Sequence, residues 1–361
     1  MQRVQHARGW SVLPKVTFII TLGLITAATG FKAAATDVFT DPVGFITLTA
    51  EGTSGPGSPA YSFLGLGMTQ IPALRGVIGT VSGTQVPVNS TLTAGQFNAV
   101  AEGPQFYIED TNTNSPTCGF TDDIISNDTA NVYTSTNDAA QMASGDTFKI
   151  YPHWTLTSLF GATDQAGLQQ GSSSTADQIL VQNPLTQAFT TYYYATATKS
   201  LTAGWKNAAG NTDASQVPLY GDQGLLINRV VSTNLSVMLV GAVKLGPTLI
   251  PLGPLNNFAG NVYATSATVL SNSGLYTDGV QTDSLVAGSA STADLVLIHN
   301  DPTGAFSTYY YATATKSLTA GWKNAAGNTD ASAVSIPIGA ELLIQIQPSH
   351  SGFNWKAPAP Y

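Results

Sequence analysis

Two copies of one sequence segment carry the aromatic and acidic side chains that could bind a ligand. The candidate residues are Tyr193, Trp205 and Asp213, with their counterparts Tyr310, Trp322 and Asp330. Exposed Tyr and Trp rings could stack on sugar rings, while neighbouring carboxylates accept hydrogen bonds from hydroxyls. Ordinary packing is the preferred alternative, because both aromatic residues are common in sheets and bridge core and surface.

A second group of side chains has part of a calcium-loop pattern. Asp110, Asn112 and Asn114 place side-chain oxygens at alternate positions. The pattern departs at its sixth position, where Ser115 replaces Gly, and at its twelfth, where Thr121 replaces Glu. Further carboxylates stand nearby, at Asp122, Asp123 and Asp128. A turn rich in Asn and Asp is the preferred explanation. We therefore predict no cofactor, with calcium as the alternative.

The sequence contains no recognisable catalytic constellation. The nucleophile motif G-x-S-x-G does not occur, and no His or Cys pair has the spacing of a zinc site. After residue 35 the histidines are His153, His299 and His350, which we interpret as structural. Cys118 is the single cysteine, so an intrachain disulfide is impossible. A carboxylate pair for glycoside hydrolysis depends on distance in space, which spacing in sequence does not give. We predict a protein without enzymatic activity.

A long internal duplication organises the chain. Residues 191–215, TYYYATATKSLTAGWKNAAGNTDAS, recur unchanged at 308–332, an offset of 117, and weaker similarity extends the unit to 174–230 and 291–347. Two copies are too few for a solenoid, so paired β modules are predicted. The predicted divisions are a signal peptide at 1–35, an N-terminal β domain at 36–160, repeat module 1 at 161–243, a Pro/Gly-rich linker and connecting segment at 244–277, and repeat module 2 with the C-terminal tail at 278–361.

Short strands are predicted throughout these divisions. Runs rich in β-branched and aromatic residues alternate with clusters of Pro, Gly, Asn and Asp, both in the repeats and at 76–88, 106–110 and 147–154. After the leader, no window has a long apolar stripe at helical spacing. The predicted fold class is all-β, with an N-terminal small β-sandwich or barrel followed by two homologous β-rich repeat modules.

The N-terminus has the pattern of an export signal. Arg3, Arg8 and Lys15 precede an uncharged apolar run at 16–28, and Ala33 to Ala35 offer a signal peptidase site. The run is shorter than the roughly 20 residues that span a bilayer. We therefore expect cleavage after residue 35 and a mature chain without a membrane span. Its expected location is periplasmic, cell-surface or extracellular.

Loss of this leader would leave a strongly acidic chain. All 21 acidic residues follow it, whereas 4 of the 13 basic residues precede residue 36, so 9 basic residues would face 21 acidic ones, a formal charge of −12. Such a charge disfavours nucleic acid and anionic membrane surfaces as partners. The predicted partners are other envelope or matrix components, including polysaccharide.

Several motifs resemble those of a family of exported bacterial proteins. The motifs are TDPVGFITLT at 40–49, GDTFKIYPHWTLTSLF at 145–160, the paired segments with Tyr-Tyr-Tyr and Gly-Trp-Lys-Asn-Ala, and WKAPAPY at 355–361. Together they resemble an uncharacterised family of exported two-repeat β-rich proteins from Verrucomicrobia and related bacteria. The resemblance would cover nearly the whole mature chain. It implies export and a two-repeat layout, and it offers no catalytic residues to transfer.

These observations lead to two functional hypotheses. The first is an exported, non-enzymatic structural or adhesive protein of the cell envelope or extracellular matrix. The export pattern, the acidic and weakly charged composition and the duplication favour it. The alternative is a carbohydrate-binding protein that uses the repeated Tyr and Trp residues as platforms.

Overall fold

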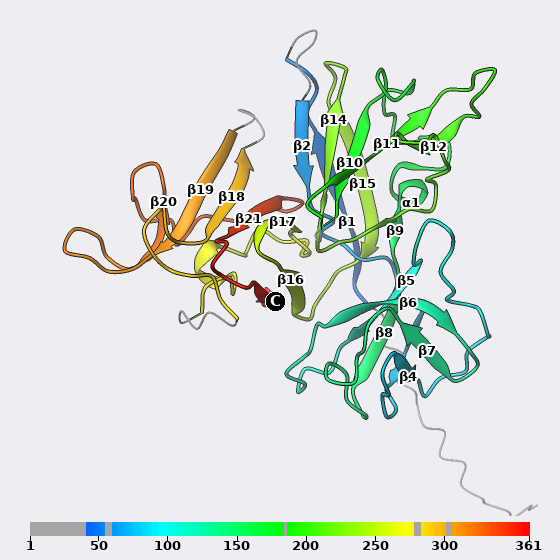
Figure 1. The fold of residues 1–361 in the computed structure, drawn as a ribbon, viewed down its shortest axis with the longest axis horizontal. Helices are drawn as coiled ribbons and strands as arrows, with labels where there is room; N and C mark the ends of the chain where they lie inside the picture. Colours follow the sequence, from blue (N-terminus) through cyan, green and yellow to red (C-terminus); the bar gives the residue numbers. More distant parts are fainter. Residues whose placement is uncertain (1–40, 55–59, 184–185, 278–282, 301–304) are drawn as a thin grey trace, which may run out of the picture. The chain divides into compact units, whose positions relative to one another are not determined.

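The computed structural model describes residues 41–54, 60–183, 186–277, 283–300 and 305–361. In these ranges the regular structure is almost entirely antiparallel β-sheet (Figure 1), with one short helix, α1 (Leu156–Phe160), and a 3-10 turn, η1 (Leu270–Asn272). The prediction of an all-β fold is thereby confirmed. Within the same ranges, no helix is long and apolar enough to cross a membrane. The expected signal peptide, residues 1–35, lies outside the described residues.

The first repeat module is a small sandwich of a five-stranded sheet and a two-stranded ribbon. The sheet has the order β12–β11–β10–β14–β2, and the ribbon pairs β1 with β15. The strands are β1 (Val43–Ala50), β2 (Ala60–Leu64), β10 (Gln178–Gln182), β11 (Phe189–Ala195), β12 (Gly204–Asn207), β14 (Leu225–Arg229) and β15 (Leu235–Ala242). Side chains of the ribbon alternate between buried and exposed, so Leu48 and Val237 join Ile179 and Ile227 in one core.

The second repeat module has the same topology. Its sheet has the order β20–β19–β18–β21–β17, and its ribbon pairs β16 with β22. The strands are β16 (Thr248–Leu252), β17 (Leu255–Gly260), β18 (Leu295–Asn300), β19 (Ala305–Ala312), β20 (Gly321–Asn324), β21 (Glu341–Ile346) and β22 (Phe353–Ala357). Tyr311 pairs with Trp322 in this module as Tyr194 pairs with Trp205 in the first. The two repeats are therefore modules of one fold, as predicted.

A separate six-stranded sheet contains most of the predicted N-terminal domain. Its strands are β3 (Leu74–Val77), β4 (Gln85–Pro87), β5 (Phe106–Asp110), β6 (Thr121–Asn127), β7 (Asn131–Thr134) and β8 (Thr147–Pro152), in the order β3–β8–β5–β6–β7–β4. A bridge between Ile78 and Val88 connects the two edge strands, so the sheet curves into a half-barrel around Phe97, Ile108 and Ile150.

The strand pairing divides the chain differently from the sequence-based boundaries. In the first module, β13 (Pro218–Leu219) pairs with β9 (Trp154–Thr155), and in the second module the amide of Ile336 makes the equivalent contact, donating to the carbonyl of Thr268 at 2.9 Å. The first module therefore resumes at β9, after the half-barrel. The half-barrel at 74–152 is thus an insertion into the first module. Blue β1 and β2 accordingly lie beside green strands in Figure 1. The expected linker at 244–277 contains β16, β17 and η1, which belong to the second module.

Equivalent backbone contacts join the two modules. The amide of Gly65 donates to the carbonyl of Gly339 at 2.8 Å, and that of Gly260 donates to the carbonyl of Asp222 at 2.9 Å. Glycine is required at this approach, because a Cβ atom on Gly65 would lie 2.3 Å from the carbonyl oxygen of Ala340. Each module therefore contributes the same kind of glycine contact to the junction.

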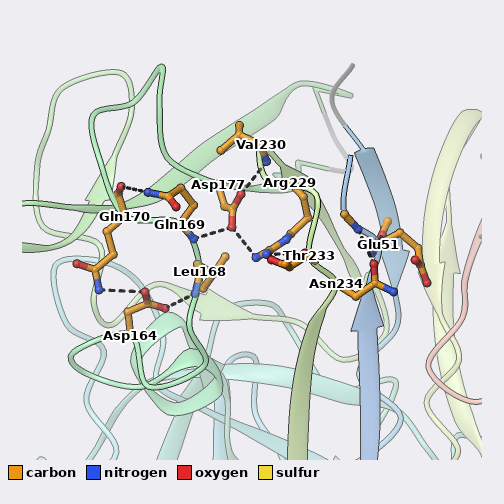
Figure 2. A network of polar contacts seen from close by, with 12 residues as sticks. Glu51, Asp164, Leu168, Gln169, Gln170, Asp177, Arg229, Val230, Thr233 and Asn234 are labelled. Carbon is orange, nitrogen blue, oxygen red and sulfur yellow. Dashed lines mark hydrogen bonds and ion pairs between the residues drawn. The ribbon is translucent and has the colours of Figure 1, made fainter. Parts of the chain in front are cut away.

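A buried carboxylate stabilises the first module beside its five-stranded sheet (Figure 2). Asp177 Oδ2 accepts from Arg229 Nη1 at 2.6 Å and from the amide of Gln169 at 2.7 Å, while Oδ1 accepts from the amide of Val230 at 2.8 Å. Arg229 also donates to the carbonyl of Thr233 at 2.8 Å. Both charged side chains are almost fully buried, so each neutralises a charge that would otherwise be costly.

The second module keeps the carboxylate and changes its side-chain partner. Asp294 accepts from the amides of Val286 and Gln347, both at 2.7 Å, as Asp177 does from the corresponding amides. The position of Arg229 is occupied by Ile346, and His350 Nδ1 instead lies 2.8 Å from Asp294 Oδ2. In both modules a buried aspartate thus accepts from the same two backbone amides, while its side-chain partner differs.

Candidate functional site

A cleft of about 250 Å³ lies where the half-barrel, the turn after β13 and the second ribbon come together. The half-barrel contributes Asp123 from β6 and His153, which follows β8. The turn contributes Tyr220 and Asp222, and β16 contributes Leu249. The cleft therefore depends on the insertion, because the inserted sheet supplies one of its walls.

Two donors hold the carboxylate of Asp123. His153 Nε2 lies 2.9 Å from Oδ1, and the hydroxyl of Tyr220 donates to Oδ2 at 2.8 Å. The His153 ring is buried between Tyr107 and Tyr220, with 4.8 Å between ring centroids in each case. Gln70 Nε2 donates to the carbonyl of His153 at 2.5 Å. Asp123 is thus held in one orientation with both oxygens engaged.

Asp222 is the carboxyl group of the cleft that remains available. Burial raises the pKa of Asp222, and the nearby charge of Asp123 raises it further, against the influence of His153 and Lys244. Among the described residues, only its own backbone amide donates a hydrogen bond to this carboxyl. Burial likewise raises the pKa of Tyr220, with the Asp123 carboxylate as the next cause, so the phenol stays a neutral donor.

A buried ion pair lies at the wall of the cleft. Lys244, which lines the cleft, forms a salt bridge with Glu109 of β5, and both side chains are almost fully buried. Burial is the largest cause that raises the pKa of Tyr107, followed by the negative charges of Glu109 and Asp222. The pair fixes the start of the second module against the half-barrel, and the lysine partly offsets the acidic lining.

A second hollow of about 490 Å³ adjoins the cleft. The two share Asp222, Gln223, Pro251 and Asn354. The second hollow adds further amide and aromatic side chains, among them Gln182, Asn257 and Phe258. Together the hollows offer carboxyl and amide groups beside apolar walls, a combination suited to hydroxyl-rich ligands longer than one ring.

The side chains that line the cleft are mainly carboxyl, amide, hydroxyl and aromatic groups. None of the described residues that line it is Ser or Cys. Asp123 has both oxygens engaged by His153 and Tyr220, which suits a positioning group better than an attacking one. What the arrangement can do is accept and donate hydrogen bonds from a preformed, partly desolvated surface.

The repeated tryptophans lie inside the modules. Trp205 is 1% exposed and Trp322 is 2% exposed. The indole nitrogen of Trp205 donates to the carbonyl of Gly161 at 2.9 Å, and its ring contacts Phe160 and Tyr194. Stacking on a sugar needs an exposed ring face. The burial of both indoles supports the packing explanation for these residues.

The repeated tyrosines lie in core clusters separate from those of the tryptophans, while the repeated aspartates form backbone β-bridges with the lysines that follow the tryptophans. The hydroxyls of Tyr193 and Tyr310, both 1% exposed, donate to Asn211 Oδ1 and Asn328 Oδ1, at 2.6 Å each. Both asparagines have φ of 54°, the left-handed region that Asn tolerates. The two acidic candidates, Asp213 and Asp330, are exposed, and each accepts a hydrogen bond from a nearby serine hydroxyl. The repeated residues thus fix a turn in each module.

The candidate calcium ligands form a hydrogen-bonded turn. Asp110 is buried and accepts from the amide of Asn112 at 2.9 Å and from the hydroxyl of Thr117 at 3.3 Å. Asn112 Oδ1 accepts from the amide of Asn114 at 3.1 Å. Across the described ranges, no group of three or more His, Cys, Asp or Glu side chains is placed to hold a metal. The oxygens of this segment bond to the chain itself, as the turn explanation requires.

Sequence reasoning did not identify Tyr220 and Asp222, although one signal for them exists. In the second module their places are taken by Pro337 and Gly339, within an otherwise similar segment. The sequence suggests Asp123 only as a calcium ligand and His153 only as a structural residue. Their meeting depends on tertiary packing of distant segments, which no local pattern encodes.

Comparison with protein-family models, with curated proteins and with solved structures finds no match for this chain.

Proposed function

We propose that the protein is an exported, non-enzymatic adhesive protein that binds a neutral polysaccharide of the cell envelope or matrix in the cleft beside Asp222. The observation that carries this proposal is the Asp222 carboxyl, which lies in the cleft without a donor from another described residue. Asp222 is half-buried and lines the cleft, so a ligand hydroxyl could donate a hydrogen bond to its carboxyl group.

The surroundings of Asp222 favour a neutral ligand. Asp122 and Asp123 also line the cleft, and this acidic lining disfavours phosphate, sulfate or carboxylate groups. Gln70, Gln223 and Asn354 offer amides that can both donate and accept hydrogen bonds. The adjoining hollow supports a ligand of several sugar units over a single one.

Affinity electrophoresis in gels that contain β-glucan, xylan, mannan or dextran tests the proposal. We expect one of these polymers to retard the protein, and isothermal titration with a matching oligosaccharide to give a saturable site. Asp222→Asn and Tyr220→Phe should weaken binding about 10- to 100-fold, the effect of losing a buried hydrogen bond of ~1–3 kcal/mol. Asp330→Asn, a change at an exposed carboxylate outside the cleft, is the matched control and should bind as the wild type does.

Two results would contradict the proposal. The first is an absence of retardation by all four polymers. The second is binding that survives Asp222→Asn and Tyr220→Phe but is lost when Asp213 or Asp330 is replaced. Release of reducing ends from any bound polymer would show an enzyme and would contradict the non-enzymatic part.

A further inference from the structure

The outer face of the first ribbon is exposed and apolar. We define this outer ribbon face by Val43 and Phe45 of β1 and by Met238 and Val240 of β15, which are 62–68% exposed. Phe45 stands directly opposite Val240 in the strand register. The other exposed outward positions of both strands are Thr or Ser, so the face carries no charge. Contiguous apolar surface of this kind usually marks an interaction site in a soluble protein.

The equivalent face of the second ribbon is built differently. Lys356 there takes the place of Met238, because each is the fourth residue of a strand whose first residue pairs with the last residue of its partner. This second face is contacted by a loop of the half-barrel: the amide of Leu249 donates to the carbonyl of Gly119 at 3.0 Å, and Lys356 Nζ to that of Pro116 at 3.3 Å. The second ribbon is therefore partly covered by a loop of this chain, whereas no equivalent contact to the first ribbon is found among the described residues.

We propose that the outer ribbon face is a self-association surface, on which a second copy of this chain docks ribbon to ribbon across a two-fold axis. Covering of the equivalent ribbon by this same chain is the first reason for choosing a second copy. The second reason is that this face carries no charge, so two copies of an acidic chain meet there with the least repulsion. A two-fold axis lets one patch serve both copies.

The size of the patch sets the expected strength. Four side chains that are about two-thirds exposed would bury on the order of 400 Å² per copy, about half of the ~800 Å² of a standard interface. Association should therefore be weak and concentration-dependent. The surface is separate from the cleft, since the ribbon residues that line the cleft belong to β16 and β22.

Sedimentation equilibrium of the purified protein, at concentrations up to about 1 mM, tests this surface. We expect a monomer–dimer equilibrium. Met238→Lys, which gives the first ribbon the side chain of the second, and Phe45→Lys should each raise the dissociation constant at least ~10-fold, because two like charges would then face each other. Ile71→Lys is the matched control, since Ile71 is 63% exposed and lies outside the ribbon. Unchanged melting temperatures will show that the variants are folded.

A cross-linking readout reports the geometry directly. Thr47 is exposed on the same face, and the native Cys118 is buried. Thr47→Cys should form an interchain disulfide under mild oxidation, whereas Ile71→Cys should not. A protein that stays monomeric up to about 1 mM, a dimer unaffected by both ribbon lysines, or equal cross-linking of the two cysteine variants would overturn the proposal.

Discussion

Replacement of the equivalent buried aspartates, Asp177 and Asp294, should lower the stability of the first module more than that of the second. Three donors converge on Asp177, namely Arg229 Nη1 and the amides of Gln169 and Val230. Asp177→Asn preserves the shape, but it removes the charge and turns an NH₂ group towards one of these donors. Arg229, 2% exposed, would be left as a buried cation that cannot release its proton. Loss of one partner from such a pair costs about 3–5 kcal/mol.

Asp294→Asn is the matched change in the second module. The amides of Val286 and Gln347 lose the same acceptor, but the remaining side-chain partner is the imidazole of His350. Unlike a guanidinium group, an imidazole has a neutral form, so no obligatory buried charge remains. The expected cost is that of impaired hydrogen bonds, about 1–3 kcal/mol.

Hydrogen exchange followed by mass spectrometry at neutral pH separates the two modules. Peptides from β14 should lose more protection in Asp177→Asn than peptides from β21 lose in Asp294→Asn. Equal losses in the two variants, or an Asp177→Asn cost below about 1 kcal/mol, would refute the argument from the buried arginine.

Two other outcomes follow from burial. Trp205→Ala and Trp322→Ala should each lower the unfolding free energy of their module by about 3–5 kcal/mol in urea titrations, and a loss within about 0.5 kcal/mol, typical of exposed positions, would contradict their packing role. Burial raises the pKa of Glu341 well above its ordinary value. Between the unfolded-state pKa of ~4.3 and the higher folded-state pKa, the folded state therefore binds more protons than the unfolded state. The unfolding free energy should accordingly fall as the pH rises through this range. Glu341→Gln should remove that decline in melting temperature as the pH rises above about 4, and parallel profiles for variant and wild type would contradict it.

The fold class and the repeat could be predicted because both depend on local pattern. β15 alternates buried and exposed side chains over its whole length, and such a period of two is visible in sequence. The first strands of each module were not recognised as equivalent. β1 and β16 share alternation but little identity, and β1 pairs with β15, a strand almost 200 residues away. Alternation requires only apolar side chains on one face, so related strands can diverge beyond recognition.

The cleft could not be predicted because its residues meet only in the folded chain. Asp123 and His153 lie at ends of half-barrel strands, and Tyr220 lies in a turn of the first module. The repeated aromatic residues attracted attention by type and recurrence, yet Trp205 serves packing. The repeated residues are those that both modules need for folding. The cleft residues Tyr220 and Asp222 lie where the two copies differ, because among the described residues the first module alone contributes this turn to the cleft.

One structural asymmetry gives the protein both of its proposed surfaces. The half-barrel interrupts only the first module, where it forms the cleft with the turn at Tyr220 and Asp222, and its loop contacts the second ribbon at Leu249. Among the described residues no equivalent loop contacts the first ribbon, and Met238 is exposed there. A weak dimer with one cleft per copy would hold a polymer at two points, which raises the effective affinity without any new contact. Met238→Lys should therefore lower retention on a polysaccharide gel at least ~10-fold, while the affinity for a short oligosaccharide in solution stays unchanged. Equal retention of variant and wild type would show that the ribbon face does not contribute to polysaccharide binding and that the cleft alone accounts for it.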